Sequence, residues 1–197
     1  MGRPNPILDD LFRLRDLSMW VGARAIDPLT CPIADLYAAT FVTLTFTRQK
    51  NGVRGEKVGH GRSDHPQLCP VLCLVERVRA LRSIQASPST PLNAFAPSRP
   101  GGPFRHVTAK GLTARIRTTL AIHPDPSYFP HEVSARSTRA GGAMALLCAG
   151  VDRDRIRMIG RWRSDETFRY LHLQAQSLMT GVSAAMLRCG AFQLAPA

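Results

Sequence analysis

Two arginines and a tyrosine in the C-terminal part of the chain have the residue types that chemistry on a phosphodiester requires. Arg136 and Arg139 are separated by two residues, and Tyr170 is nine residues after Arg161. Guanidinium groups bind phosphate oxygens in a bidentate manner that lysine cannot reproduce. A tyrosine hydroxyl can act as a covalent nucleophile when positive charge surrounds it. Together these residues favour phosphoryl transfer, although each one taken singly is more often a surface or packing residue.

Short helices must position these side chains. Ser137 can cap a first helix that ends at Gly150, because glycine readily adopts the left-handed conformation that ends helices. Asp152 can cap a second helix, which Gly160 would end. Ser164, followed by two acidic residues, should begin a third helix that carries the tyrosine.

A small sheet is expected ahead of the helices. Residues 41–47 alternate β-branched or aromatic side chains with period two, and Asn51-Gly52 is a strong hairpin signal before a return strand over 53–61. Residues 12–26 are consistent with a strand, a turn and a short strand, with a helix through Leu17 as the alternative. Lys50 would then lie at the hairpin tip, as a solvated turn lysine or within reach of a bound nucleic acid.

Two further helices are predicted between the sheet and the arginines. One begins at Pro70, and the other follows Thr108 and carries three apolar residues on one face. Residues 86–103 are rich in proline and should form a loop or linker. The expected fold class is therefore α+β, a mostly helical domain with a small antiparallel sheet near the N-terminus.

The charge of the chain predicts a polyanionic partner. Of 26 basic residues 23 are arginine, against 14 acidic residues, and the net charge is +12. Neutralising phosphates and releasing their counterions would drive association with nucleic acid. The alternative is a basic protein whose arginines only keep it in solution.

Neither a metal, a cofactor nor a membrane is expected. The cysteines, five in number, and the histidines match no common zinc-binding spacing, and the thiols should be reduced. No apolar run approaches the roughly 20 residues that cross a bilayer, and residues 1–12 lack the apolar segment of a secretory signal. These features predict an intracellular protein, nuclear if the source is eukaryotic.

The order of these motifs resembles the catalytic domain of tyrosine recombinases, the phage-integrase-like family. Residues 136–139 stand at that family's His-x-x-Arg, residues 160–162 at its Gly-His/Trp, and residues 170–172 resemble its Tyr-x-His. The motifs Arg-x-Gly-Gly-Ala and Gly-Arg-Trp-x-Ser-Asp are most similar to those of the Crypton and DIRS-type recombinases of eukaryotic mobile elements. The resemblance covers residues 12–187, with a loose lead-in over 1–11 and a tail over 188–197.

The resemblance implies metal-free cleavage and rejoining of duplex DNA through a 3′-phosphotyrosyl intermediate. Tyr170 would attack the phosphate, Arg139 would hold its non-bridging oxygens, and Lys50 would protonate the departing 5′-oxygen. Spacing to the tyrosine selects Arg161 as a further hydrogen-bond donor, whereas residue type selects Trp162. Further DNA contacts are expected from three neighbouring arginines, which are Arg48, Arg54 and Arg163. Copies of the chain could also assemble on DNA.

Two departures from the family pattern predict impaired catalysis. Arg136 stands where histidine is usual, so it can bind phosphate but cannot carry a proton near neutral pH. The family's first catalytic arginine precedes its sheet, and of the nearby candidates, Arg13 and Arg15, neither has the usual glutamate three residues on. The chain is thus expected to begin downstream of that arginine. Two interpretations stay open: an impaired recombinase, or a non-catalytic basic DNA-binding domain derived from one.

Overall fold

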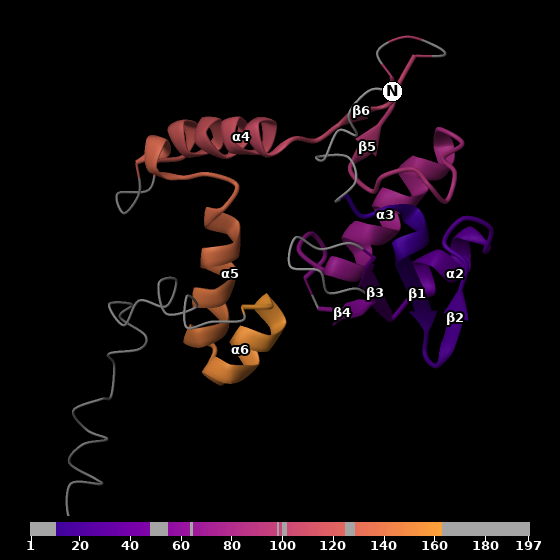
Figure 1. The fold of residues 1–197 in the computed structure, drawn as a ribbon, viewed down its shortest axis with the longest axis horizontal. Coiled ribbons are helices and arrows are strands. Elements are labelled where there is room, and N and C mark those ends of the chain that lie inside the picture. Colours follow the sequence, from indigo (N-terminus) through magenta and orange to yellow (C-terminus); the bar gives the residue numbers. More distant parts are fainter. Residues whose placement is uncertain are drawn as a thin grey trace, which may run out of the picture. The chain divides into compact units, whose positions relative to one another are not determined.

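The fold is α+β, and the chain divides into two units. The computed structural model describes residues 11–47, 55–63, 65–97, 99, 102–124 and 129–162 (Figure 1). The first unit is Met1–Val107 and the second is Thr108–Ala197. Small antiparallel sheets lie in the first unit, whereas the described part of the second unit contains helices.

A four-stranded sheet with strand order β2-β1-β3-β4 forms the centre of the first unit. Its strands are β1 (Leu17–Val21), β2 (Arg24–Ile26), β3 (Phe41–Phe46) and β4 (Glu56–Gly61), and all neighbours are antiparallel. Gly22, with φ of +57°, makes the tight turn from β1 to β2, a conformation that glycine adopts without steric cost. The predicted strand, turn and short strand are confirmed, and so is the antiparallel return strand. The Asn51-Gly52 turn lies outside the described residues.

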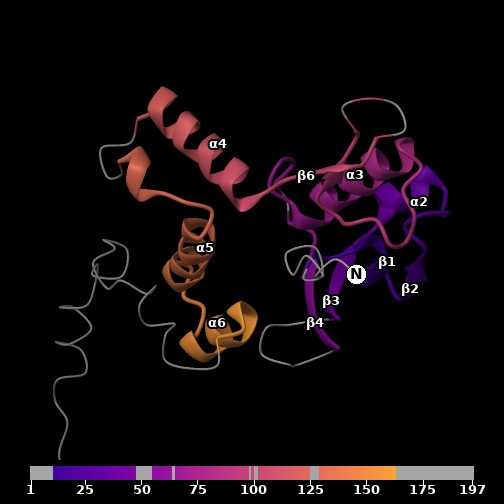
Figure 2. The same ribbon diagram turned by 45° about the horizontal axis from the view of Figure 1, so that its top comes forward.

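The core of the first unit lies between this sheet and α3 (Pro70–Ser83). Val71, Val75, Val78 and Leu81 recur every three or four residues, so they share one face of the helix, and all four are fully buried. Met19 and Val42 bury their side chains in the same cluster. The strands that carry them, β1 and β3, are labelled in Figure 2. The short α2 (Ile33–Ala38) adds Leu36, and η1 (Leu14–Asp16) adds Leu14. The predicted helix start at Pro70 is confirmed, with Cys69 as its N-cap residue.

The expectation of a simple loop over residues 86–103 is wrong in part. Residues Ala94–Phe95 form β5, which pairs with β6 (Arg105–His106) in a two-stranded antiparallel sheet. Ala94 is fully buried, and Leu92 packs against the core. The prolines around Ala94–Phe95 favoured a loop in the sequence prediction. In addition, a strand of two residues is too short to show a periodic pattern.

Four helical segments make up the described part of the second unit: α4 (Ala109–Ile122), η2 (Pro130–Glu132), α5 (Ser137–Cys148) and α6 (Arg153–Gly160). Thr108 caps α4 as predicted, since its Oγ1 accepts a hydrogen bond from the Gly111 amide at 3.0 Å. Asp152 caps α6 as predicted, accepting from the amides of Asp154 and Arg155. No helix among the described residues has the length and apolar character that a bilayer crossing needs.

The ends of α5 and α6 differ in detail from the sequence prediction. Ser137 is the first residue of α5 and not its cap; its hydroxyl accepts from the Ser134 amide at 3.1 Å. Gly150, with φ of +77°, ends α5 as predicted. Gly160 is the last residue of α6, and the left-handed residue that ends this helix is Arg161, with φ of 57°. Ile156 and Ala143 are the buried residues of this helix pair.

Candidate nucleic-acid interface

Arg139 of α5 meets the end of α6 in the described part of the second unit. Its guanidinium carbon lies 4.4 Å from the ring centre of Trp162, a cation–π contact. Its Nη2 donates a hydrogen bond to the carbonyl oxygen of Gly160. We call Arg139, Gly160, Arg161 and Trp162 the arginine–tryptophan junction. The structure thus brings Arg139 together with the Gly-Arg-Trp segment that follows it by 21 residues.

Gly160 permits this junction because the Trp162 ring lies against its α-carbon. A Cβ built at Gly160 would come within 1.5 Å of the ring atom Cζ3 of Trp162. Real Cβ atoms do not approach so closely, so any side chain at this position must displace the ring. Gly160 was predicted to end α6 by adopting the left-handed conformation, but the structure shows that its missing side chain leaves space for the ring of Trp162.

Arg161 holds a backbone conformation that usually belongs to glycine. Its amide bonds to the carbonyl of Met158 at 3.1 Å, and the Trp162 amide bonds to that of Arg157 at 3.0 Å. This pair of bonds is the Schellman motif, in which glycine is common at the left-handed position. A left-handed L-residue costs roughly 1–2 kcal/mol. The left-handed conformation of Arg161 turns the chain, so that the Trp162 ring lies against Gly160 and contacts Arg139.

The junction leaves Arg139 able to bind an anion. Arg139 is exposed, and its guanidinium carries five N–H donors, of which the bond to Gly160 uses one. The contact with the ring and the bond to Gly160 restrain the guanidinium, so less side-chain entropy is lost when a ligand binds. A fixed, exposed guanidinium is suited to bidentate contact with phosphate oxygens.

Arg136 lies one turn before Arg139, as the N-cap residue of α5, with φ of −71° and ψ of −29°. It is exposed, and its guanidinium has no hydrogen-bond or carboxylate partner among the residues that the structure describes. It borders an open groove of about 570 Å³ between α4 and residues 134–136. Lys110 and Arg117 of α4 line the same groove.

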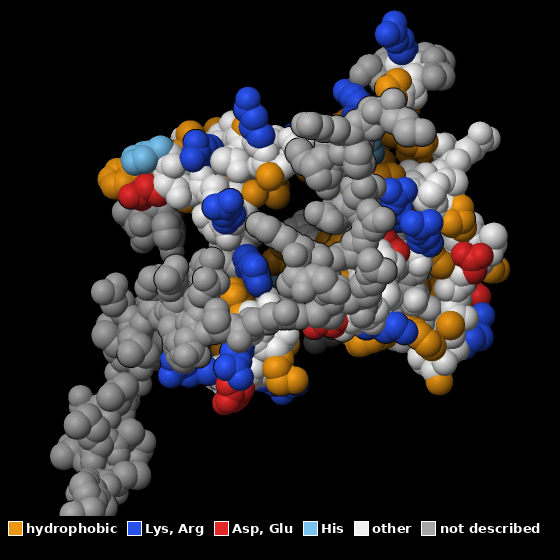
Figure 3. Space-filling model, in the orientation of Figure 1, with side chains coloured by type: hydrophobic (Ala, Val, Ile, Leu, Met, Phe, Trp, Pro, Cys, Tyr) orange, Lys and Arg blue, Asp and Glu red, His pale blue; other side chains and the backbone are white. Residues whose placement is uncertain are grey.

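Positive charge on the described surface is mostly not neutralised by carboxylates. Several arginines donate to backbone carbonyls, which hold the side chain in place but leave its charge: Arg62 to Ala39, Arg77 to Leu92, Arg82 to Pro28 and Cys31, and Arg117 to His131 and Val133. On the face shown in Figure 3, Lys and Arg side chains outnumber Asp and Glu side chains among the described residues. These arginines therefore serve the fold and still contribute to a positive potential.

Several predicted site residues lie outside the described residues. They are Lys50, Tyr170, Arg48, Arg54 and Arg163. The two candidates for the His/Trp position of the resembling family are Arg161 and Trp162, and both are half-buried. The ring of Trp162 contacts Arg139. Of the two candidates for the first arginine, Arg13 donates to the Ser89 carbonyl at 3.1 Å, and Arg15 is exposed.

Sequence reasoning missed a group of ionisable side chains in the first unit. The hydroxyl of Tyr37 donates to Oε1 of Glu76, and Nε of Arg79 donates to Oε2 of the same carboxylate at 2.8 Å. The hydrogen bond from Tyr37, and then the bond from Arg79, lower the pKa of Glu76, while the bond to Glu76 raises the pKa of Tyr37. Glu76 and Arg79 are three residues apart on α3, which the sequence could show; the long-range contact with Tyr37 it could not.

Replacing Glu76 with glutamine is expected to flatten the acid dependence of stability. Because the folded pKa of Glu76 is below its ordinary value of 4.5, its contribution to stability is present above that value. The contribution is lost as pH falls through the lowered folded value. Urea unfolding over an acidic pH series measures this, and Tyr37→Phe, which removes the main cause, should give part of the same effect. Identical acid dependence in the wild type and Glu76→Gln would contradict the assignment.

Among the described residues, no group of three or more His, Cys, Asp or Glu side chains is placed to hold a metal ion. The four described cysteines are free thiols: Cys31, Cys69, Cys73 and Cys148.

No family model, curated protein or solved structure matches this chain.

Proposed function

We propose that this chain is a DNA-binding domain of the tyrosine-recombinase type, whose reaction is strand cleavage and rejoining through a phosphotyrosyl intermediate on Tyr170. The observation that carries the proposal is the contact of Arg139 with Gly160 and Trp162. The motif resemblance pairs these same two segments around one phosphate. Their contact in the structure supports that pairing without depending on the spacing of the motifs.

The physical chemistry of the junction fits a phosphate ligand. Phosphoryl transfer relies on cationic donors that already point at the oxygens where charge grows, so that no reorganisation is needed during the reaction. Arg139 meets this condition because Trp162 and the Gly160 carbonyl fix its guanidinium before any ligand arrives. Arg136, one turn away and without a carboxylate partner among the described residues, adds a second cation.

Arg136 also favours a second candidate function, a non-catalytic DNA-binding domain. A guanidinium stays protonated at all ordinary pH values, so it can bind phosphate but cannot accept a proton from a tyrosine hydroxyl. Both candidates require DNA binding, and they differ in whether Tyr170 forms a covalent adduct.

Duplex DNA binding across a salt series tests the requirement that the two candidates share. The wild type should bind with a log–log salt slope of about −0.9 per phosphate contacted. Arg139→Ala should weaken binding by roughly 10-fold to 100-fold, because a hydrogen bond to a charged group contributes about 1.5–3 kcal/mol. It should also make the slope less steep by about 0.9.

Arg24→Ala is the matched control, because Arg24 carries the same charge but is already paired with Asp35 at 3.0 Å. It should change both affinity and slope less than Arg139→Ala does. Circular dichroism of each variant separates loss of a contact from loss of folding. Wild-type binding that is equally tight at low and high salt would refute the proposal.

A further inference from the structure

We propose that the groove between α4 and residues 134–136 binds a second backbone phosphate of the same DNA strand, next to the phosphate assigned to Arg139. This inference rests on the proposed function. Arg136 borders the groove and lies three residues before Arg139. Residues three apart at the start of a helix are neighbours, with Cβ atoms about 5–6 Å apart. Arg136 thus lies between Arg139 and the groove, so a strand whose scissile phosphate is held at Arg139 can place its next phosphate in the groove, facing Lys110 and Arg117.

Among the residues that the structure describes, the groove is lined by cations and by no carboxylate. Its charged lining residues are Lys110, Arg117 and Arg136. Arg117 is held by bonds from Nε to the Val133 carbonyl at 2.9 Å and from Nη2 to the His131 carbonyl at 2.8 Å. These bonds fix the guanidinium beside residues 134–136 and leave its charge intact. An anion entering the groove thus meets one fixed cation and two adaptable ones.

Two hydroxyl groups in the groove are set to donate. Oγ1 of Thr113 accepts from the Ala135 amide at 3.0 Å, and Oγ of Ser134 accepts from the Arg136 amide at 3.3 Å. Neither hydroxyl donates to another residue that the structure describes. Since both oxygens act as acceptors, their hydrogens are available for an incoming acceptor. Phosphate oxygens, which accept and never donate in the ionised diester, match this pattern.

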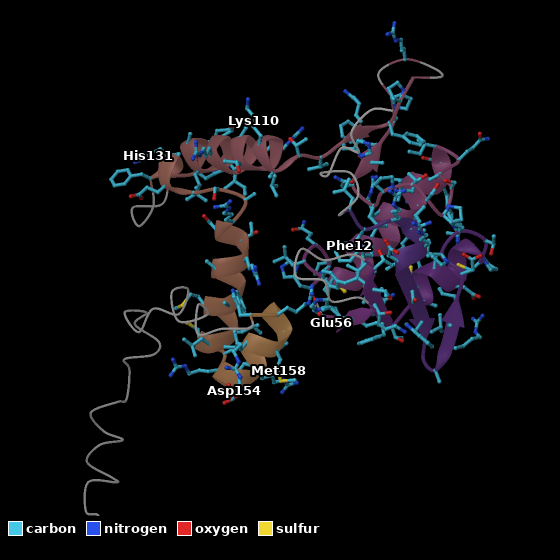
Figure 4. The ribbon with its side chains drawn as sticks, viewed as in Figure 1. Phe12, Glu56, Lys110, His131, Asp154 and Met158 are labelled. Carbon is cyan, nitrogen blue, oxygen red and sulfur yellow. The ribbon has the colours of Figure 1, made fainter. Side chains whose placement is uncertain are left out.

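The shape of the groove favours a phosphate that belongs to a polymer. The remaining lining residues are small: Ala109, Ala114 and Ala135. These alanines allow the sugar–phosphate backbone of DNA to approach closely. Because the groove is open, a DNA strand can pass through it, whereas sites for small molecules usually enclose most of the ligand. Lys110 projects from the first turn of α4 into solvent (Figure 4). Its flexible ammonium can follow a phosphate at the edge of the groove.

Lys110→Ala tests the groove, with Arg115→Ala as the matched control. Arg115 carries the same charge on the same helix but does not line the groove, and a spacing of five residues places it well away from the Lys110 face. In the duplex-DNA salt series, Lys110→Ala should make the slope less steep by about 0.9, and Lys110→Arg should restore it. Arg115→Ala should leave the slope at the wild-type value.

The outcomes separate this inference from the proposed function. Wild-type DNA binding with equal slopes for Lys110→Ala and the wild type would refute the groove and leave the proposed function standing. Absence of salt-dependent wild-type binding would refute both. A second arm follows the backbone amide signals of Ser134, Ala135 and Arg136 by NMR. Saturable shifts with a short duplex are expected, and equal saturation by inorganic phosphate at the same concentration would overturn the assignment to nucleic acid.

Discussion

Replacing Gly160 with alanine is expected to release the Trp162 ring from Arg139 and to destabilise the α5–α6 pair by about 1–3 kcal/mol. The added methyl group would have to occupy the position of the ring, because the Cβ would lie 1.5 Å from ring atom Cζ3. The ring must therefore move, and Arg139 loses the surface that fixes its guanidinium. DNA affinity should fall together with stability, although no charge has been removed.

The fluorescence of Trp162 measures this displacement. The chain has two tryptophans, so a Trp20→Phe background leaves Trp162 as the single reporter. Gly160→Ala should shift its emission toward that of an exposed indole and lower the urea midpoint. Gly141→Ala is the control, since a Cβ there meets nothing within 4 Å. It should raise stability by about 0.5–1 kcal/mol, as expected for glycine to alanine inside a helix. Unchanged emission and midpoint in Gly160→Ala would contradict the junction.

Periodicity made much of the fold predictable. The sequence of β3 alternates with period two, and Val42 is buried while Leu44 packs against the core; α3 repeats apolar residues every three or four positions, and these form one buried face. The N-caps Thr108 and Asp152 were also predictable, because a Thr or Asp directly before a helical pattern commonly accepts a hydrogen bond from an amide of the first turn. Strand β5 was not predictable, since a two-residue strand is defined only by its pairing with β6.

For the candidate site, the sequence indicated residues but could not indicate the contacts between them. Sequence spacing pointed to Arg139 and to the Gly-Arg-Trp segment, and the structure adds that the ring of Trp162 lies on the guanidinium. The reason for Gly160 depends on a contact with a ring two residues away, reached through the left-handed conformation of Arg161. Glycine is the usual residue in such a conformation, so the sequence favoured Gly160, and not Arg161, as the residue that ends α6.

The groove shows the same limit on a larger scale. Lys110 and Arg117 have the spacing of one helix face, which the sequence could show, but Arg136 is 19 residues beyond Arg117. It joins them because Arg117 and Thr113 bind backbone groups of residues 131–135. Side chains that tie one segment to another create a charged surface that no local pattern contains.

Changing Arg136 to histidine is expected to raise covalent adduct formation by about 10²-fold near neutral pH. In the proposed step, the Tyr170 oxygen bonds to the scissile phosphorus, the bond to the 5′-oxygen breaks, and Lys50 gives that oxygen a proton. The tyrosine proton must go to a base, and an imidazole can accept it whereas the Arg136 guanidinium cannot. A positioned general acid or base typically contributes 10²–10⁴-fold.

A nicked suicide substrate resolves this step, because the short 5′-hydroxyl fragment diffuses away and traps the adduct for a denaturing gel. The wild type should form traces of adduct, Arg136→His should form it faster, and Tyr170→Phe should abolish it in both backgrounds. Since Arg136 and an imidazole both bind phosphate, DNA affinity should change far less than the rate, which distinguishes a lost proton carrier from a lost contact. Equal, efficient adduct formation by the wild type and Arg136→His would show that Arg136 does not impair the reaction. Intact DNA binding with no adduct from either protein would leave the non-catalytic domain as the function of this chain.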